Sequence, residues 1–569
     1  MLEYLREDIF MRKLFLLSVT LFVCSSAFSL EVDRSELQSV SQTAIEFINY
    51  TGPHRVIDSA AAIRSIGSGM GAVISGSRGS SSRAGNARYS VIHAVDPSEK
   101  GRLDADILII GADAEVDHIN NLRRIIAGYL EAAYGYSRDD SDTLAVFITV
   151  YNAVYRGKLD EAGKKYKQIV LDNVTSADFG LSVNYRDWPG HSQIIIPVYD
   201  AENGGLSTVD TSVISDSKVV ESMKDDDDRN VESRKNMVDI KERESEDASE
   251  AAKAAQKDAV AEQKTADEEQ KKASDAQQRA DDAQKAADSA QKEADDAQKK
   301  ADDAKQTAAE NPRDSQAQKD AKQAQAEADE AAKRADDAQK EADDAQKEAD
   351  DAQKKADDAQ QRADDAKEDA QEKQALADKK QAEAQAERKE IARDQQEIQE
   401  IEAAQANMKV DYGIVLFDDK SVLSRMVRYN SQTGEVVKNS PVTTLRGRSI
   451  YKAGDSYIAI AGENSKNGAI KLVLISPDNM EISMESELNI AADSVLVQDG
   501  GEYYCVIDDG GEYYVGKFGA DLSLKLKSQV KVKAATPSAI GSSTISVTDS
   551  RGTFKVLDKS DLSDIAGGK

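Results

Sequence analysis

A run of near-identical heptads fills the middle of the chain and constrains its fold more than any other feature. Residues 335–355 read ADDAQKE, ADDAQKE, ADDAQKK, and looser copies extend from about 232 to 406. Alanine recurs at spacings of three and four, which places a small apolar stripe along one face of a helix. Alanine is also the best helix former, so the repeat predicts long helices. A stripe of Ala, Asp, Gln and Lys indicates a scaffold and offers no catalytic group.

The heptad phase slips once. Alanine keeps one heptad position over 273–301 and again over 335–363, but residues 301 and 335 are 34 apart, one short of five heptads. Asn311-Pro312 lies in this interval, and proline breaks helices. Two arrangements fit: an extended rod that bends at Pro312, or an antiparallel hairpin that turns within about Glu310–Arg313. Asn311 is expected to cap the second helix, with Pro312 at its first position.

The helices gain support from their surface charges. Asp336, Lys340 and Asp344 follow each other at i,i+4 spacing, and each such pair contributes about 0.2–0.5 kcal/mol. Association of the helices as a coiled coil has weaker support, since a buried alanine methyl contributes about 0.8 kcal/mol or less.

The start of the chain resembles an export signal. Met11–Lys13 is basic, residues 14–24 are apolar, and 27–29 have the small residues of a cleavage site. Residues 1–29 are therefore predicted to be a signal peptide, with Met11 as the true start and a periplasmic or cell-envelope location. Lipidation of Cys24 is the alternative.

The remaining composition limits the partners and the redox chemistry. A net charge of −30 argues against a nucleic-acid or anionic-membrane partner. No apolar run is long enough to span a membrane. After cleavage only Cys505 remains, so no internal disulfide forms. Its strand-like context EYYCVID predicts a small buried residue rather than a reactive thiol.

The chain divides by composition into a head, a linker, a helical segment and a β-rich end. Residues 30–206 read as an α/β or α+β head. In the head, the expected helices are 35–50, 117–134 and 160–171, the expected strands are 89–95, 106–111, 144–151 and 194–198, and 67–85 is expected as a flexible loop. Residues 207–229, including Asp225–Asp228, are predicted to be an acidic polar linker, and 230–407 the helical or coiled-coil segment.

Residues 408–569 contain four strand-like pairs at intervals of about 40–46 residues, with Gly, Asp or Asn turns between strands. The pairs are 413–417 with 425–429, 457–461 with 471–476, 502–507 with 514–518, and 543–547 with 553–558. This period is typical of propeller blades, and a β-sandwich is the alternative.

No catalytic, cofactor-binding or metal-ligating residue is predicted. The four histidines, at 54, 93, 118 and 191, lack the i,i+3 or i,i+4 spacing of metal ligands. Gly67, Gly69 and Gly71 lack the ending of a phosphate-binding loop, and flexibility is the preferred interpretation. Arg186 and Trp188 could line a groove, but a packed tryptophan before a Pro-Gly turn is favoured. No Ser/His/Asp arrangement can be read from the sequence.

Residues 105–137, ADILIIGADAEVDHINNLRRIIAGYLEAAYGYS, resemble the head of the spirochaetal 83/100-kilodalton antigen family of Borrelia and Treponema. The order of segments is also similar. The resemblance implies an exported, envelope-associated, immunogenic protein with no assigned enzymatic activity, and it supplies no catalytic residues.

The function predicted from the sequence is a non-enzymatic structural or interaction protein of the cell envelope. Its head and β-rich region would be binding modules joined by a helical spacer. Protein partners in the envelope and helix–helix self-association are expected, without a cofactor or nucleic acid. The alternatives are a ligand-binding or enzymatic head and a surface adhesin.

Overall fold

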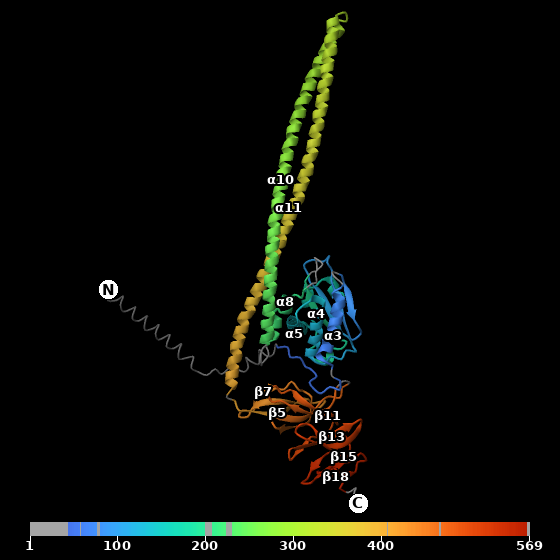
Figure 1. The fold of residues 1–569 in the computed structure, drawn as a ribbon, viewed down its shortest axis with the longest axis vertical. Coiled ribbons are helices and arrows are strands. Elements are labelled where there is room, and N and C mark those ends of the chain that lie inside the picture. Colours follow the sequence, from blue (N-terminus) through green and yellow to red (C-terminus); the bar gives the residue numbers. More distant parts are fainter. Residues whose placement is uncertain are drawn as a thin grey trace, which may run out of the picture. The chain divides into compact units, whose positions relative to one another are not determined.

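The computed structural model describes residues 44–56, 58–76, 80–199, 208–223, 230–406, 408–465 and 468–565. It has two compact units, one from the described parts of Met1–Met237 and Lys389–Lys569, the other from Val238–Arg388 (Figure 1). The predicted signal peptide, with Cys24, and Asp225–Asp228 lie outside the described residues.

The head contains a four-stranded antiparallel sheet in the order β1-β2-β3-β4. Its strands are β1 (Ser82–Gly85), β2 (Tyr89–Ala94), β3 (Asp104–Ile110) and β4 (Ser192–Val198), and its longer helices are α3 (Ala60–Ile74), α4 (Ile119–Tyr134) and α5 (Arg138–Val154). The predicted strands at 89–95, 106–111 and 194–198 and the helix at 117–134 are confirmed. Mixed α/β architecture of the head is thereby confirmed as well.

The flexible loop predicted for 67–85 is wrong, because most of its first half belongs to α3. Gly67 and Gly71 face α4: a Cβ on Gly67 would lie 1.8 Å from the carbonyl oxygen of Ile125, and one on Gly71 2.5 Å from that of Tyr129. These glycines let two helix backbones touch. The i,i+4 spacing of these two glycines was the sequence signal that could have indicated a helix contact at this place.

Three further expectations for the head are corrected. The strand predicted at 144–151 lies inside α5, whose N-cap Ser137 accepts a hydrogen bond from the Asp140 amide. The helix predicted at 160–171 is broken into α6 (Leu159–Ala162), η1 (Gly163–Lys165) and α7 (Gln168–Leu171), because Tyr166 leaves the helix to bridge to Leu103. The described end of the helix predicted at 35–50 is extended, with Ile48 bridged to Asn184.

Part of the predicted linker belongs to the head. Residues 208–223 form α8 (Thr211–Ile214) and α9 (Ser217–Ser222), and both helices contact α5. Ile214 and Val219 are fully buried. The polar composition of 207–229 concealed these short apolar anchors.

The heptads form two long helices, α10 (Val231–Glu310) and α11 (Ser315–Gln405), which run side by side as an antiparallel hairpin (Figure 1). The extended rod is therefore wrong. The turn comprises residues 311–314. Asp314, rather than Asn311, caps the second helix by accepting hydrogen bonds from the amides of Gln316 and Ala317.

Alanines from both helices form the seam of the hairpin. Ala280 packs in one cluster with Ala345, and Ala294 in another with Ala331. The members of each pair lie at nearly equal sequence distances before and after Pro312. On the outside, Gln-to-Asp hydrogen bonds recur at i,i+4, as from Gln339 to Asp343 (2.9 Å). These bonds, rather than the predicted pairs around Lys340, join the exposed side chains.

The C-terminal region is an all-β domain. Its strands are β5 (Val410–Asp418), β6 (Leu423–Asn430), β7 (Val436–Asn439), β8 (Leu445–Ala453), β9 (Ser456–Ala461), β10 (Lys471–Ile475), β11 (Ile482–Ile490), β12 (Val497–Asp499), β13 (Glu502–Asp509), β14 (Glu512–Phe518), β15 (Leu524–Lys531), β16 (Ala539–Ile540), β17 (Thr544–Thr548) and β18 (Phe554–Asp558). All four predicted strand pairs form, as β5/β6, β9/β10, β13/β14 and β17/β18.

The larger sheet has the order β15-β14-β13-β11-β10-β9-β8-β6-β5 and stays open, with β5 and β15 at its edges. Successive residues of β13 face two different hydrophobic cores: Cys505 packs in one cluster and Val506 in the other. The domain is thus an open, sandwich-like arrangement in which central strands are buried on both faces.

Candidate functional site

A groove of about 450 Å³ lies where residues 46–54 of the head meet strands of the β domain. The head contributes Phe47 and His54, and the β domain contributes Phe417, Arg425 and Glu485. The groove combines apolar rings with charges of both signs. Titratable side chains from the head and from the sheet converge in this groove.

His54 is the titratable centre of this groove. Its Nε2 lies 3.0 Å from Asp117 Oδ2, and its ring packs edge-on against Tyr50. The hydrogen bond to Asp117 raises the pKa of His54, and the nearby Glu485 carboxylate raises it further. Burial opposes this rise. The site therefore favours an imidazolium that is held against the carboxylate.

Direct bonds join the head to the β domain beside the groove. Arg186 Nη2 donates to Glu463 Oε1 at 2.7 Å, and the Tyr185 hydroxyl donates to the same carboxylate at 3.3 Å. The Ala469 amide donates to the Pro53 carbonyl at 2.9 Å. Burial and Glu463 raise the pKa of Tyr185 to about 12. Arg186 thus serves a contact between the two domains.

Trp188 does not line a groove. Its side chain is fully buried, and its indole N–H donates to the Ser182 carbonyl at 2.7 Å. The ring of Phe47 packs edge-on against it. The prediction of a packed tryptophan is confirmed.

A second polar cluster lies in the centre of the head. His93 Nδ1 lies 2.6 Å from Asp106 Oδ1, and the hydroxyls of Tyr129 and Tyr134 both donate to Asp106 Oδ2. Asp106 is completely buried. Burial and this carboxylate raise the pKa of both tyrosines, which therefore remain protonated donors.

Strand register places Ser82 directly opposite His93, and His93 is itself opposite Asp106, so the three residues form a row across the sheet. The structure therefore assembles a Ser/His/Asp row that the sequence did not reveal. The Ser82 hydroxyl is buried without a hydrogen-bond partner in the described part of the chain. Because hydroxyl and imidazole are both covered, the row has the character of a core network rather than an open site.

A buried ion pair joins the start of β3 to the N-cap of α7. Lys167 Nζ lies 3.0 Å from Asp104 Oδ2, and it also donates to the Asp96 carbonyl at 2.7 Å. Both side chains of the pair are fully buried. Neither residue was singled out from the sequence, where a lysine in a polar stretch gives no sign of burial.

The other histidines have separate structural partners. His118 caps α4 by accepting a hydrogen bond from the Asn120 amide at 3.1 Å, and burial lowers its pKa. His191 is exposed and lies 3.6 Å from Asp178. In the residues that the structure describes, no group of three or more His, Cys, Asp or Glu side chains could hold a metal ion.

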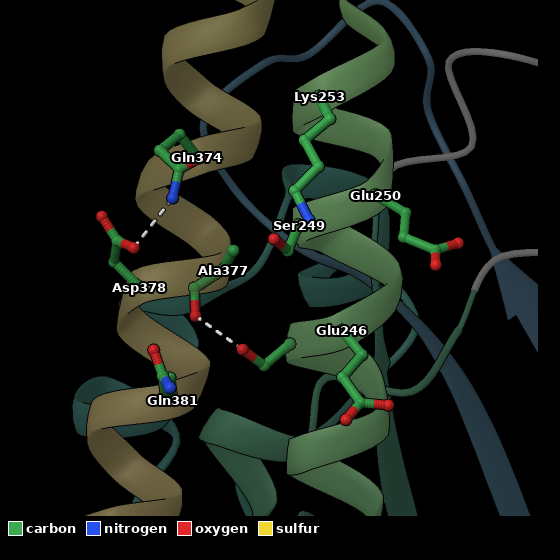
Figure 2. Close-up of a pocket in the computed structure, with 9 residues that line it drawn as sticks. Glu246, Ser249, Glu250, Lys253, Gln374, Ala377, Asp378 and Gln381 are labelled. Carbon is green, nitrogen blue, oxygen red and sulfur yellow. Dashed lines mark hydrogen bonds between the residues drawn. The ribbon is translucent and has the colours of Figure 1, made fainter.

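A polar groove of about 300 Å³ lies between the two long helices (Figure 2). Ser245 Oγ donates across it to the Ala377 carbonyl at 3.0 Å, and Gln374 bonds along α11 to Asp378 at 2.9 Å. Figure 2 shows Glu246 and Glu250 pointing away from the partner helix. The groove is a gap in the alanine seam, bridged by one hydroxyl.

Cys505 is buried in β13, and burial raises the pKa of its thiol. The prediction of a small buried core residue is confirmed. In the described ranges, no helix is both long and apolar enough to cross a membrane.

The fold defines a class of multidomain protein, with an α/β head joined to an open β domain and a long alanine-seamed helical hairpin inserted between them in the sequence. The family model described as Borrelia P83/100 protein matches residues 34–538. The chain therefore belongs to the Borrelia P83/100 family, as the resemblance of residues 105–137 indicated. Among curated proteins no match was found.

Proposed function

We propose that the chain is an exported, non-enzymatic structural or interaction protein of the cell envelope. In this proposal the head and the β domain act together as a binding module, and the hairpin is an arm that extends the reach of the molecule. Membership of an antigen family supports an envelope location.

The hairpin is the observation that carries this proposal. With 80 residues in α10, it is about 120 Å long. The chain enters and leaves it at one end, where Arg388 pairs with Glu242 at 2.5 Å. A hairpin that returns to its origin cannot space the head from the β domain, and Arg186 and Glu463 join those two directly. Reach toward a partner accounts better for its length.

Shortening the hairpin symmetrically tests the proposal. Deletion of 283–296 together with 329–342 removes two heptads from each helix, keeps the register, and shortens the arm by about 21 Å. Deletion of 283–296 alone is the unbalanced control, which leaves 14 residues of α11 without their partners in α10. We expect the paired deletion to fold and to lose envelope crosslinks made near residues 311–314. If the shortened protein kept every crosslink and the cells still grew normally, the proposed role of the hairpin as an arm would be refuted.

Protease added to intact cells separates a periplasmic protein from a surface adhesin.

A further inference from the structure

The groove between the head and the β domain carries an excess of carboxylates on its walls. Glu46 lines it from the head, and Glu481 and Glu485 line it from the β domain. Glu485 lies 3.5 Å from Lys471. In the part of the chain that the structure describes, no Lys or Arg side chain pairs with Glu46 or Glu481, and both are exposed. The groove therefore favours an occupant that brings positive charge.

The cations already present in the groove have partners. Arg425 is the one Lys or Arg side chain among the described lining residues, and its guanidinium stacks 5.6 Å from the centroid of the Phe417 ring. The imidazole of His54 is held 3.0 Å from the Asp117 carboxylate. Neither cation lies within ion-pair distance of the three glutamates, so the excess of negative charge remains.

The head wall also has backbone groups that remain open for hydrogen bonding. Ile48 uses both of its own on a neighbouring segment: its amide donates to the Val183 carbonyl at 2.8 Å, and its carbonyl accepts from the Tyr185 amide at 3.1 Å. The backbone groups of adjacent residues in an extended strand point to the opposite side. Those of Asn49 and Thr51, which line the groove, make no hydrogen bond within the described ranges. They form a free strand edge.

Side chains on the two faces of this extended segment differ in character. Phe47 packs edge-on against the buried Trp188, whereas the neighbouring Glu46 is exposed. A strand added beside the segment would continue both faces, because its side chains also alternate. Apolar side chains would extend the face of Phe47, and basic side chains would lie beside Glu46. Phe417, 40% exposed, adds apolar surface from the β domain.

We propose that the groove binds an extended segment of a partner protein in which basic and apolar residues alternate. The inference rests on the proposed function, in which the head and the β domain form one binding module, and it names the chemistry of the partner. The segment pairs through its backbone with Asn49 and Thr51, and its basic side chains reach Glu46 and Glu481. Backbone pairing supplies affinity, and alternate side chains supply specificity.

Binding of labelled peptides to the mature chain, followed by fluorescence anisotropy, tests the pattern. The probe is the peptide KVKVKV, and the control KKKVVV has the same composition without the alternation. We expect KVKVKV to bind at least about tenfold more tightly than KKKVVV, and EVEVEV not to bind. Absence of binding by KVKVKV, or equal binding of KVKVKV and KKKVVV, overturns the proposal, since equal binding would reduce the interaction to charge alone.

Substitutions of exposed glutamates locate the site. E46Q and E481Q should each weaken binding of KVKVKV by roughly three- to tenfold. E487Q is the matched control, because Glu487 is exposed on β11 and lies outside the groove. Thermal unfolding verifies that the variants fold. Equal effects of E481Q and E487Q would contradict binding in the groove.

A photoactivatable group at the central valine of KVKVKV gives a direct readout of position. Crosslinks are expected within residues 46–52 and 440–443, which line the groove. Crosslinks confined to α10 and α11 would show that the peptide binds the acidic hairpin instead, and would overturn the proposal. The arm is tested separately through envelope crosslinks near residues 311–314, so either idea can fail while the other stands.

Discussion

Arg234 Nη1 lies 2.5 Å from Asp394 Oδ2, and both side chains are buried although 160 positions separate them in the sequence. The pair joins the first turns of α10 to the last turns of α11. Two more pairs follow along the helices: Lys241 with Glu383 at 3.2 Å, and Lys380 with Glu244 at 2.8 Å. Identical heptads would match alanine to alanine after a slip of seven residues. The three charged pairs would be separated by such a slip, so they specify the register of the hairpin.

We therefore predict that R234L/D394L allows the hairpin to slip by one heptad. Cysteines at Ala280 and Ala345 report the native register, and cysteines at Ala280 and Ala338 report the slipped one. The slipped crosslink should appear only when the ion pair is removed. The slip moves Pro312 into the first turn of α11, where proline is tolerated.

The opposite slip provides the control for this prediction. It would bring Ala280 beside Ala352 and carry Pro312 into the end of α10, where its ring clashes with the preceding turn. Equal crosslinking in both directions would show that the charged pairs and the proline do not determine the register. Spin labels at the exposed Lys285 and Lys340 should lie on the order of 20 Å apart in the intact hairpin, because paired helices pack 8–10 Å apart.

The contact between α3 and α4 predicts opposite effects on stability when two nearby glycines of α3 are replaced by alanine. G67A should destabilise the head by about 1–3 kcal/mol, since the new methyl group would meet the Ile125 carbonyl. G69A is the matched control: no atom lies within 4 Å of its Cβ position, and alanine should stabilise the helix by up to about 1 kcal/mol. Fluorescence of Trp188, the single tryptophan, reports unfolding of the head. Similar effects of both changes would rule out close helix packing.

The raised pKa of His54 predicts a pH dependence of stability. A histidine whose pKa is higher in the folded state stabilises fully below its unfolded pKa of about 6.5, and loses that contribution as pH rises through the folded pKa. The stability difference between the unaltered chain and H54N should therefore shrink as pH rises above about 6.5.

His118 supplies the control with the opposite sign. Burial lowers its pKa, so it costs stability at low pH, and H118N should help the chain most under acid conditions. Asparagine keeps the N-cap of α4, which isolates the effect of titration. A pH-independent difference for H54N would disprove the coupling of His54 to Asp117.

Removal of one partner from the Lys167–Asp104 pair should be costly. K167M leaves the Asp104 carboxylate buried without its cation, and we expect a loss of about 3–5 kcal/mol in denaturant unfolding followed by Trp188 fluorescence. The double variant K167M/D104L removes both charges and should regain much of the loss. If the double variant is no better than K167M, the lysine contributes through its stem and its bond to the Asp96 carbonyl.

The sequence alone determined those elements whose signal is local. The heptads specify long helices, the spacing of apolar residues over 117–134 specifies α4, and each strand pair of the β domain carries its own turn. Cys505 in EYYCVID was recognisable as a core residue for the same reason. In these places propensity, periodicity and turn residues agree, so tertiary contacts had nothing to override.

Tertiary structure decided the rest, where one local pattern is compatible with two outcomes. The apolar run 144–151 suits a strand or a buried helix, and packing of α5 under the sheet selects the helix. Gly67 and Gly71 suit a loop until another backbone approaches them. The heptads suit a rod or a hairpin. The choice depends on contacts such as Arg234 with Asp394, which no short window of sequence contains.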